Sequence, residues 1–204
     1  KFEGANRMRQ AEQGISALSD KVDSLIIIPN DRLKYVTDQK ITFANAFGIA
    51  DDVLKQAVIS ISELVGDASN VVINLDFADV SAIMKDAGRA HMGVGIASGR
   101  EMAEQAALAA VASPLLETSI KGATGVLVNV TGSAELTLDD VEPAAGIVQQ
   151  EANPEANIIF GATWDNSFED EMRVTVIATG FDEKKPAAPR MGAFSTAVEK
   201  SKPV

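Results

Sequence analysis

Two carboxylates and an amide stand close together in residues 74–80 (NLDFADV), where an apolar run gives way to a helical pattern. Asp76 and Asp79 are three residues apart, and residues at that spacing share one face of a helix. Such a pair can orient and polarise an attacking water, the usual role of the protein in nucleoside triphosphate hydrolysis. The chain contains no Walker-type phosphate-binding loop, so the pair would act on a target outside it.

The same two acids also have a purely structural explanation. Asp76 can cap the N-terminus of a helix and Asp79 can lie in its first turn, and the helix dipole favours both. The two explanations are compatible, because a helix that starts at a surface loop also presents its acids. The spacing alone favours the structural explanation.

The elements before these acids decide how they are positioned. A short helix is predicted over residues 6–19, and the apolar run over residues 24–28 is typical of a strand in a parallel sheet. Residues 41–65 carry apolar side chains every three or four positions, which predicts one helix about 36 Å long. Because this length is about the width of a domain, we expect the helix to connect two domains.

From residue 89 the pattern predicts the order β-α-β-α-β-β. One helix would start at Ser98, which forms a capping-box pattern with Glu101, and another at Thr137. A β-α-β unit implies a parallel pair of strands, and the short spacer over residues 164–170 suggests an antiparallel last strand. The prediction is an α+β sheet of about four strands.

Composition excludes several classes of function. The net charge of −11 argues against nucleic acid and anionic lipid as partners. The chain has no cysteine and a single histidine, which excludes disulfides, thiolate chemistry and a multi-histidine metal site. No apolar stretch approaches membrane-spanning length and no signal peptide is visible, so a cytoplasmic protein is expected. Because the first residue is Lys1, we expect a fragment or a processed product.

Other motifs have ordinary explanations. Gly93, Gly95 and Gly99 fall partly inside a predicted strand, so close packing explains them better than a dinucleotide fingerprint. The lone His91 is expected to be packed or on the surface. Phe47 lies one turn before Asp51; the pair could stack on a base and hydrogen-bond its edge, but the periodicity favours a core position for Phe47.

Eight stretches match a family pattern and are distributed over residues 2–181. They are residues 2–4 with Arg7, 11–15, 28–33, 46–51, 74–80, 113–116, 125–132 and 174–180. In these stretches the chain resembles the FtsZ family, the bacterial tubulin-like cell-division GTPases. The family's glycine-rich phosphate-binding loop is absent.

The resemblance implies an α/β and α+β fold. Residues 1–40 would be the end of a Rossmann-like GTPase domain, and residues 41–66 the long central helix. Residues 67–181 would form the C-terminal GTPase-activating domain, a four-stranded mixed sheet with flanking helices. Residues 182–204 would be a disordered linker or tail.

The resemblance also assigns roles to individual residues. The acidic loop would complete the GTP site of the next subunit, with Asp76 and Asp79 positioning the hydrolytic water and Asn74 placing the loop near the phosphates. The nucleotide edge would comprise Glu3 and Arg7 at the ribose and phosphates, Asn30 and Asp51 at the guanine, and Phe47 stacked on the base. The groove near Asn129 resembles the inhibitor-binding cleft of the family.

The expected ligand is GTP or GDP, with Mg²⁺ in the intact protein and none bound to this chain alone. Expected partners are further copies in a head-to-tail filament or a separate N-terminal fragment, and division proteins for the intact protein. Nucleic acid and direct membrane binding are not expected. The expected location is the cytoplasm, at the midcell division ring.

Two alternatives stay open at the level of sequence. One is a stand-alone β-α-β-α-β-β small-molecule regulatory domain, which leaves the long helix without a purpose. The other is a carboxylate hydrolase that uses Asp76 and Asp79 within one chain, which needs a third polar partner. Both alternatives place the acids in an internal pocket, whereas the FtsZ-like hypothesis places them on an exposed end.

Overall fold

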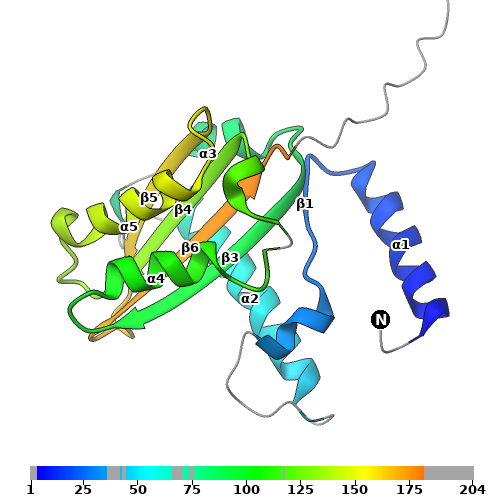
Figure 1. The fold of residues 1–204 in the computed structure, drawn as a ribbon, viewed down its shortest axis with the longest axis horizontal. Helices are drawn as coiled ribbons and strands as arrows, with labels where there is room; N and C mark the ends of the chain where they lie inside the picture. The colour runs from blue at the N-terminus through cyan, green and yellow to red at the C-terminus, as the bar shows by residue number, and fades with distance from the viewer. Residues whose placement is uncertain are drawn as a thin grey trace, which may run out of the picture.

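The structure, a computed structural model, describes residues 4–35, 42, 45–65, 71–73, 76–116 and 118–181, with Lys34, Leu64 and Val65 described by their backbone alone. Six strands form one sheet in the order β1-β3-β6-β4-β5-β2, flanked by helices on both faces (Figure 1). The strands are β1 (Ser24–Ile26), β2 (Val71–Ile73), β3 (Gly88–Ser98), β4 (Gly125–Gly132), β5 (Asn157–Trp164) and β6 (Glu171–Thr179).

The sheet is mixed, as the sequence predicted. Strands β4 and β5 are parallel, β1 is parallel to β3, and β2 is antiparallel to β5. The four long strands are the predicted ones, and the two three-residue strands β1 and β2 extend the sheet at its edges. The run over residues 24–28 therefore forms a shorter, half-buried edge strand rather than a buried one.

Strand β6 differs from the predicted arrangement. It runs antiparallel between β3 and β4 instead of returning beside β5. Its residues from Met172 to Thr179 are all buried, and a strand buried on both faces belongs at the centre of a sheet. Strand β5 also extends through Trp164, which the sequence placed in the spacer.

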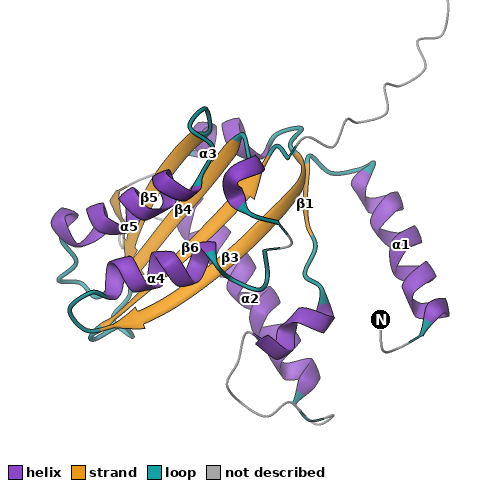
Figure 2. Cartoon of the chain, viewed as in Figure 1, coloured by secondary structure: helices purple, strands orange, loops and turns teal. Residues whose placement is uncertain are grey.

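Two layers of helices cover the sheet (Figure 2). Helices α4 (Met102–Val111) and α5 (Leu138–Glu151) pack on one face, and α2 (Ala46–Val65) and α3 (Phe77–Met84) pack on the other. Successive side chains of a strand point to opposite faces. In β4, Val126, Val128 and Val130 accordingly join the core under α4 and α5, while Leu127 joins the core under α2 and α3.

Close packing explains the glycines of β3, as predicted. A Cβ atom on Gly93 would lie 2.1 Å from the carbonyl oxygen of Ala110, and one on Gly95 would lie 2.1 Å from that of Ala106. Backbone of α4 thus touches backbone of β3. The predicted capping box of Ser98 and Glu101 is wrong: Ser98 ends β3, Gly99 turns the chain with a φ of +87°, and α4 begins without a side-chain cap.

The N-terminal segments lie beside this body. Helix α1 (Ala5–Ser19) stands next to β1 and buries none of its side chains (Figure 1). A 3₁₀ helix, η1 (Asn30–Tyr35), follows β1 and precedes α2 along the chain. Helix α2 has 20 residues and is about 30 Å long at 1.5 Å per residue. It begins at Ala46, later than the predicted residue 41, since Thr42 lies outside the helix. The tail over residues 182–204 lies outside the described residues. Among the described helices, none is long and apolar enough to cross a membrane.

Candidate functional site: an acidic helix start and a separate nucleotide edge

At the start of α3, the side chain of each of Asp76 and Asp79 accepts a hydrogen bond from the backbone N–H of the other. The backbone N–H of Asp79 donates to Oδ1 of Asp76 at 2.8 Å, and the backbone N–H of Asp76 donates to Oδ2 of Asp79 at 3.2 Å. This reciprocal capping box confirms the structural explanation of the spacing. The cap engages one oxygen of each carboxylate, so it fixes the orientation of both acids and leaves the second oxygens outside it.

The acidic helix start is exposed and rigidly supported. Asp76 and Phe77 are exposed, with 72% of Phe77 accessible, and Asp79 is half-buried. Beneath them Ile83 is 4% exposed, and the carbonyl of Ile83 accepts a hydrogen bond of 2.9 Å from the hydroxyl of Thr179 in β6. In the described part of the chain the acids therefore lie on an outer surface, whereas the single-chain hydrolase requires them in an internal pocket.

The residues predicted at the nucleotide edge lie elsewhere. Asn30 begins η1, and Phe47 and Asp51 occupy the first turns of α2, where Phe47 is 74% exposed and Asp51 is exposed. The core position predicted for Phe47 from periodicity is therefore wrong. The reason is that the buried face of α2 is formed by residues such as Val53, Ala57 and Ser60, and Phe47 lies outside that face.

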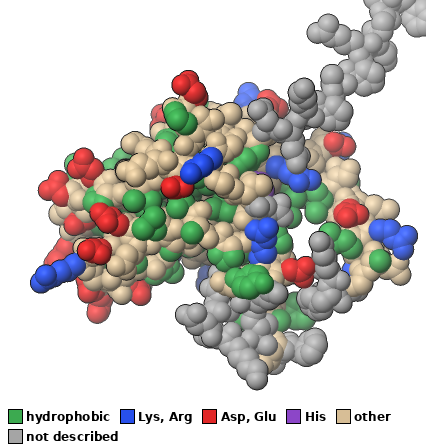
Figure 3. Space-filling view, viewed as in Figure 1, with side chains coloured by type: hydrophobic (Ala, Val, Ile, Leu, Met, Phe, Trp, Pro, Cys, Tyr) green, Lys and Arg blue, Asp and Glu red, His purple; other side chains and the backbone are tan. Residues whose placement is uncertain are grey.

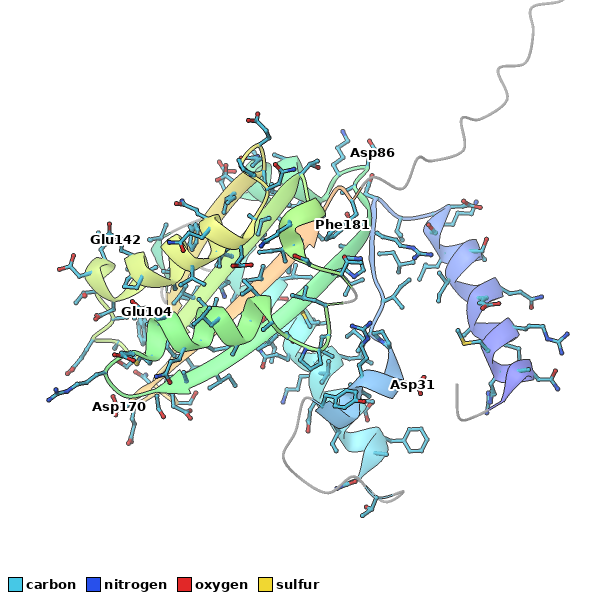
Figure 4. All side chains as sticks on the ribbon, in the orientation of Figure 1. Asp31, Asp86, Glu104, Glu142, Asp170 and Phe181 are labelled. Carbon is cyan, nitrogen blue, oxygen red and sulfur yellow. The ribbon has the colours of Figure 1, made fainter. Side chains whose placement is uncertain are left out.

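Arg7 is exposed on α1 and has an interaction partner, while Glu3 and Asn74 lie outside the described residues. Figure 4 shows Asp31, the neighbour of Asn30, beside the start of α2, and Asp86, just after α3, well above it in this view. In Figure 1 helix α3 likewise lies far from η1 and the start of α2. The structure therefore brings the two acids together and places Asn30 on an element that neighbours the helix of Phe47 and Asp51, but it keeps the two groups apart.

A polar network fills the contact between α2 and the sheet. Nη2 of Arg173 donates to both carboxylate oxygens of Glu63, at 3.1 and 3.2 Å. Nδ2 of Asn129 donates to Oε2 of Glu63 at 3.3 Å, and the hydroxyls of Ser60 and Thr175 are 3.2 Å apart. Sequence reasoning singled out only Asn129. Arg173 carried a signal that was missed, because it is a charge inside the apolar run of a central strand.

Two acids outside the predicted site, Asp140 and Asp165, have lowered pKa values. Hydrogen bonds from the side chain and then the backbone of Thr137 hold the pKa of Asp140 below its ordinary value. The backbone and side chain of Ser167 lower the pKa of Asp165 in the same way. Within the described part of the chain, no group of three or more histidines and carboxylates could hold a metal ion.

Comparisons with known proteins show which proteins this chain resembles. Residues 88–182 match the protein family described as "FtsZ family, C-terminal domain". Over 203 residues the chain is 47% identical to cell division protein FtsZ of Magnetospirillum gryphiswaldense, an alignment that covers 99% of this chain and 36% of that protein. It is 52% identical over 182 residues to cell division protein FtsZ 1 of Rhizobium meliloti, covering 89% of this chain and 30% of that one.

Solved structures give the same result. An FtsZ dimer of M. jannaschii superposes with a TM-score of 0.82 at 38% identity, covering 89% of this chain and 52% of that one. A TubZ protofilament of Bacillus thuringiensis, at 14% identity and a TM-score of 0.58, shares the fold alone. The chain spans about a third of the length of these curated relatives.

Proposed function

Because this chain belongs to the FtsZ family, as its sequence resemblance predicted, we propose that it is part of a polymerising GTPase of the bacterial division ring. Its acidic helix start, with Asp76 and Asp79, would complete the GTP-hydrolysis site of an adjacent copy. The chain would have no GTPase activity by itself.

One observation carries this proposal: helix α3, which begins at the two acids, is well separated from η1 and from the start of α2 (Figure 1). A single copy cannot bring Asp76 and Asn30 to one nucleotide. Two copies stacked head to tail can, because the acidic end of one then faces the nucleotide edge of the next. A head-to-tail contact that does not close into a ring builds a filament.

The reaction needs little from the acids beyond position. Phosphoryl transfer depends mainly on the orientation of the attacking water and on electrostatics. The capping box holds Asp76 and Asp79 in fixed orientations, and their second oxygens can accept hydrogen bonds from a water, with Asn74 placing the loop near the phosphates. Loss of the γ-phosphate would then weaken the contact between copies and promote filament turnover.

The nucleotide edge would recognise guanine by shape and hydrogen bonding. The exposed ring of Phe47 offers a stacking surface, and Asp51 and Asn30 offer acceptors and donors for the edge of the base. Glu3 and Arg7 would serve the ribose and phosphates. The described residues offer no dedicated metal site, so Mg²⁺ enters the proposal only with the phosphates of the nucleotide.

The proposed organisation follows from these roles. Residues 1–40 would belong to the nucleotide-binding domain, residues 41–66 to the central helix, residues 67–181 to the activating domain, and residues 182–204 to a linker or tail. The protein would work in the cytoplasm at the midcell ring. Its partners would be further copies or a separate N-terminal piece, and other division proteins.

A complementation experiment in the intact protein tests the shared site. Asp76→Asn copies lack a working acid and Asp51→Ala copies lack a working nucleotide edge, so each variant alone should hydrolyse almost no GTP. Mixed in equal amounts, they should recover about a quarter of wild-type turnover, because one junction in four of a random head-to-tail stack joins an intact acid to an intact edge. No recovery in the mixture would contradict the proposal.

The small-molecule alternative has less support. A cavity of about 160 Å³ lies between the starts of α4 and α5, lined by Arg100, Glu104, Asp140 and Met172 among others. Ligand pockets are usually about 300–1,000 Å³ and mostly apolar, whereas Asp and Glu side chains gather at this end of the molecule (Figure 3). We find no observation that favours this alternative over the shared GTP site.

A further inference from the structure

The side chain of Arg32 ties the segment that carries Asn30 to a distant turn. Its Nη1 donates to the carbonyl oxygen of Pro114 at 3.1 Å and to that of Leu116 at 2.5 Å. These carbonyls belong to the turn that follows α4, 82 and 84 residues farther along the chain. Hydrogen bonds from a guanidinium are charge-assisted and are stronger than neutral ones. Arg32 therefore fastens η1 to the C-terminal half of the molecule.

A buried apolar contact fastens η1 at a second point. Leu33 is 6% exposed and belongs to the same core cluster as Leu115, which is 3% exposed. One anchor is polar and the other apolar, and they lie on neighbouring residues of one short helix. Two anchors restrict both the translation and the rotation of that helix, so the position of Asn30 at its first residue is set by the C-terminal half.

Asp51, the other proposed guanine contact, is connected to the same core cluster as Leu33. Asp51 lies on α2, two positions before Val53, and Val53 packs in the core cluster that contains Leu33. We propose that Arg32 is a positioning residue for guanine recognition, holding Asn30 at the correct distance from Asp51 by binding the turn after α4. This inference rests on the proposed function, which places Asn30 and Asp51 at the base. It names Arg32 as the group that couples base discrimination to the C-terminal domain.

The test measures discrimination between bases in the intact protein. Affinities for GTP and ATP are obtained by competition against a fluorescent GTP analogue, for wild type and for Arg32→Gln. We expect the GTP-to-ATP affinity ratio to fall about tenfold, because two charge-assisted hydrogen bonds that place Asn30 are lost. The ratio is used because a loss of folded protein would lower both affinities alike and leave the ratio unaffected. If the ratio of Arg32→Gln equals that of wild type, the inference is overturned.

Arg32→Lys provides the second variant. An ammonium keeps the charge and can still donate to carbonyl oxygens, but it does not reproduce the position of Nη1, which donates both hydrogen bonds. The GTP-to-ATP ratio of Arg32→Lys should therefore lie between those of wild type and Arg32→Gln. Should Arg32→Gln fail to fold, the lysine variant decides: a lower ratio at an unchanged melting temperature supports the inference, and an unchanged ratio overturns it.

Two further variants separate the possible failures. Arg100→Gln removes an exposed arginine just after the opposite end of β3 and should leave the ratio unchanged; an equal fall would mean that Arg32 acts non-specifically and would overturn the inference. Asn30→Ala tests the proposed function itself and should lower the GTP-to-ATP affinity ratio. If it does not, the proposed guanine role of Asn30 fails and the inference fails with it. If Asn30→Ala lowers the ratio and Arg32→Gln does not, only the inference fails.

Discussion

Arg173 in the middle of β6 and Glu63 on α2 form an ion pair of 3.1 Å whose side chains are 9% and 24% exposed. The pair joins the central strand of the sheet to the helix that carries Phe47 and Asp51. Asn129 and Thr131 of β4 share the same carboxylate. The contact between α2 and the sheet is therefore polar at its centre, and any movement of α2 along the sheet has to break these bonds.

Glu63→Ala should destabilise the chain by about 2–3 kcal/mol, because it leaves the buried Arg173 without its partner. The double variant Glu63→Leu with Arg173→Met should lose less, since no unpaired charge remains. Urea unfolding of the chain measures both. Lys121→Ala is the control, because its pair with Glu151 is 3.5 Å long and 65% and 44% exposed and should contribute under about 1 kcal/mol. A similar loss in all three variants would contradict this account.

Asp79→Asn in the intact protein should separate the cap from the chemistry. An amide oxygen can still accept the backbone N–H of Asp76, so stability should change by under about 1 kcal/mol, whereas GTP turnover should fall about 100-fold because the water loses a charged acceptor. Phosphate release at saturating GTP measures turnover. Asp140→Asn is matched, because Asp140 holds the same position in the capping box of α5; turnover should be normal, and an equal loss there would argue against a catalytic role.

Gly95→Ala should destabilise the chain by about 2–3 kcal/mol, because its Cβ would lie 2.1 Å from the carbonyl oxygen of Ala106 and would force β3 and α4 apart. Thermal or urea unfolding measures the effect. Gly146→Ala is the control within a helix: nothing lies within 4 Å of its Cβ position, so it should stabilise α5 by up to about 1 kcal/mol. Tolerance of Gly95→Ala would contradict the close contact.

The cap of α5 should weaken in acid. The pKa of Asp140 is lowered in the folded state by the Thr137 hydroxyl and then by the Thr137 backbone. A lowered folded pKa means that the contribution to stability is present above the unfolded value of about 3.9 and is lost as the pH falls through the folded pKa. The stability difference between wild type and Asp140→Ala, measured by urea midpoints, should therefore shrink below about pH 4. A difference that grows in acid would reverse the assignment.

The chain by itself should interfere with assembly of the intact protein. On the proposed function, the acidic helix start of this chain would occupy an exposed nucleotide edge, and the chain itself has no Walker-type phosphate-binding loop. A several-fold excess should therefore reduce the polymer that sediments with GTP. Phe77→Asp places a charge at the exposed centre of the acidic end and should abolish the effect. Equal sedimentation with and without the wild-type chain would count against docking.

Local pattern was sufficient for much of the fold. Apolar periodicity located α1 and the four long strands, and the residues from Thr137 located the start of α5. The positions of Asp76 and Asp79 anticipated the N-terminus of a helix, because helix caps and strand alternation depend on residues within one or two turns. The same local reasoning placed a capping box at Ser98. There the strand continues through Ser98 because it pairs with Glu171 of β6, a partner far along the chain.

The sequence by itself determined the elements, the close-packing glycines of β3 and the family resemblance, since these depend on neighbouring residues or on matching motifs. Only the tertiary structure decided that β6 lies between β3 and β4, that Phe47 is exposed, and that Arg173 meets Glu63 while Arg32 meets Pro114 and Leu116. Each of these depends on residues that are distant along the chain. Which residues and strands become neighbours depends on how the whole sheet and its helices are buried together. The spacing of residues within one segment does not contain that information.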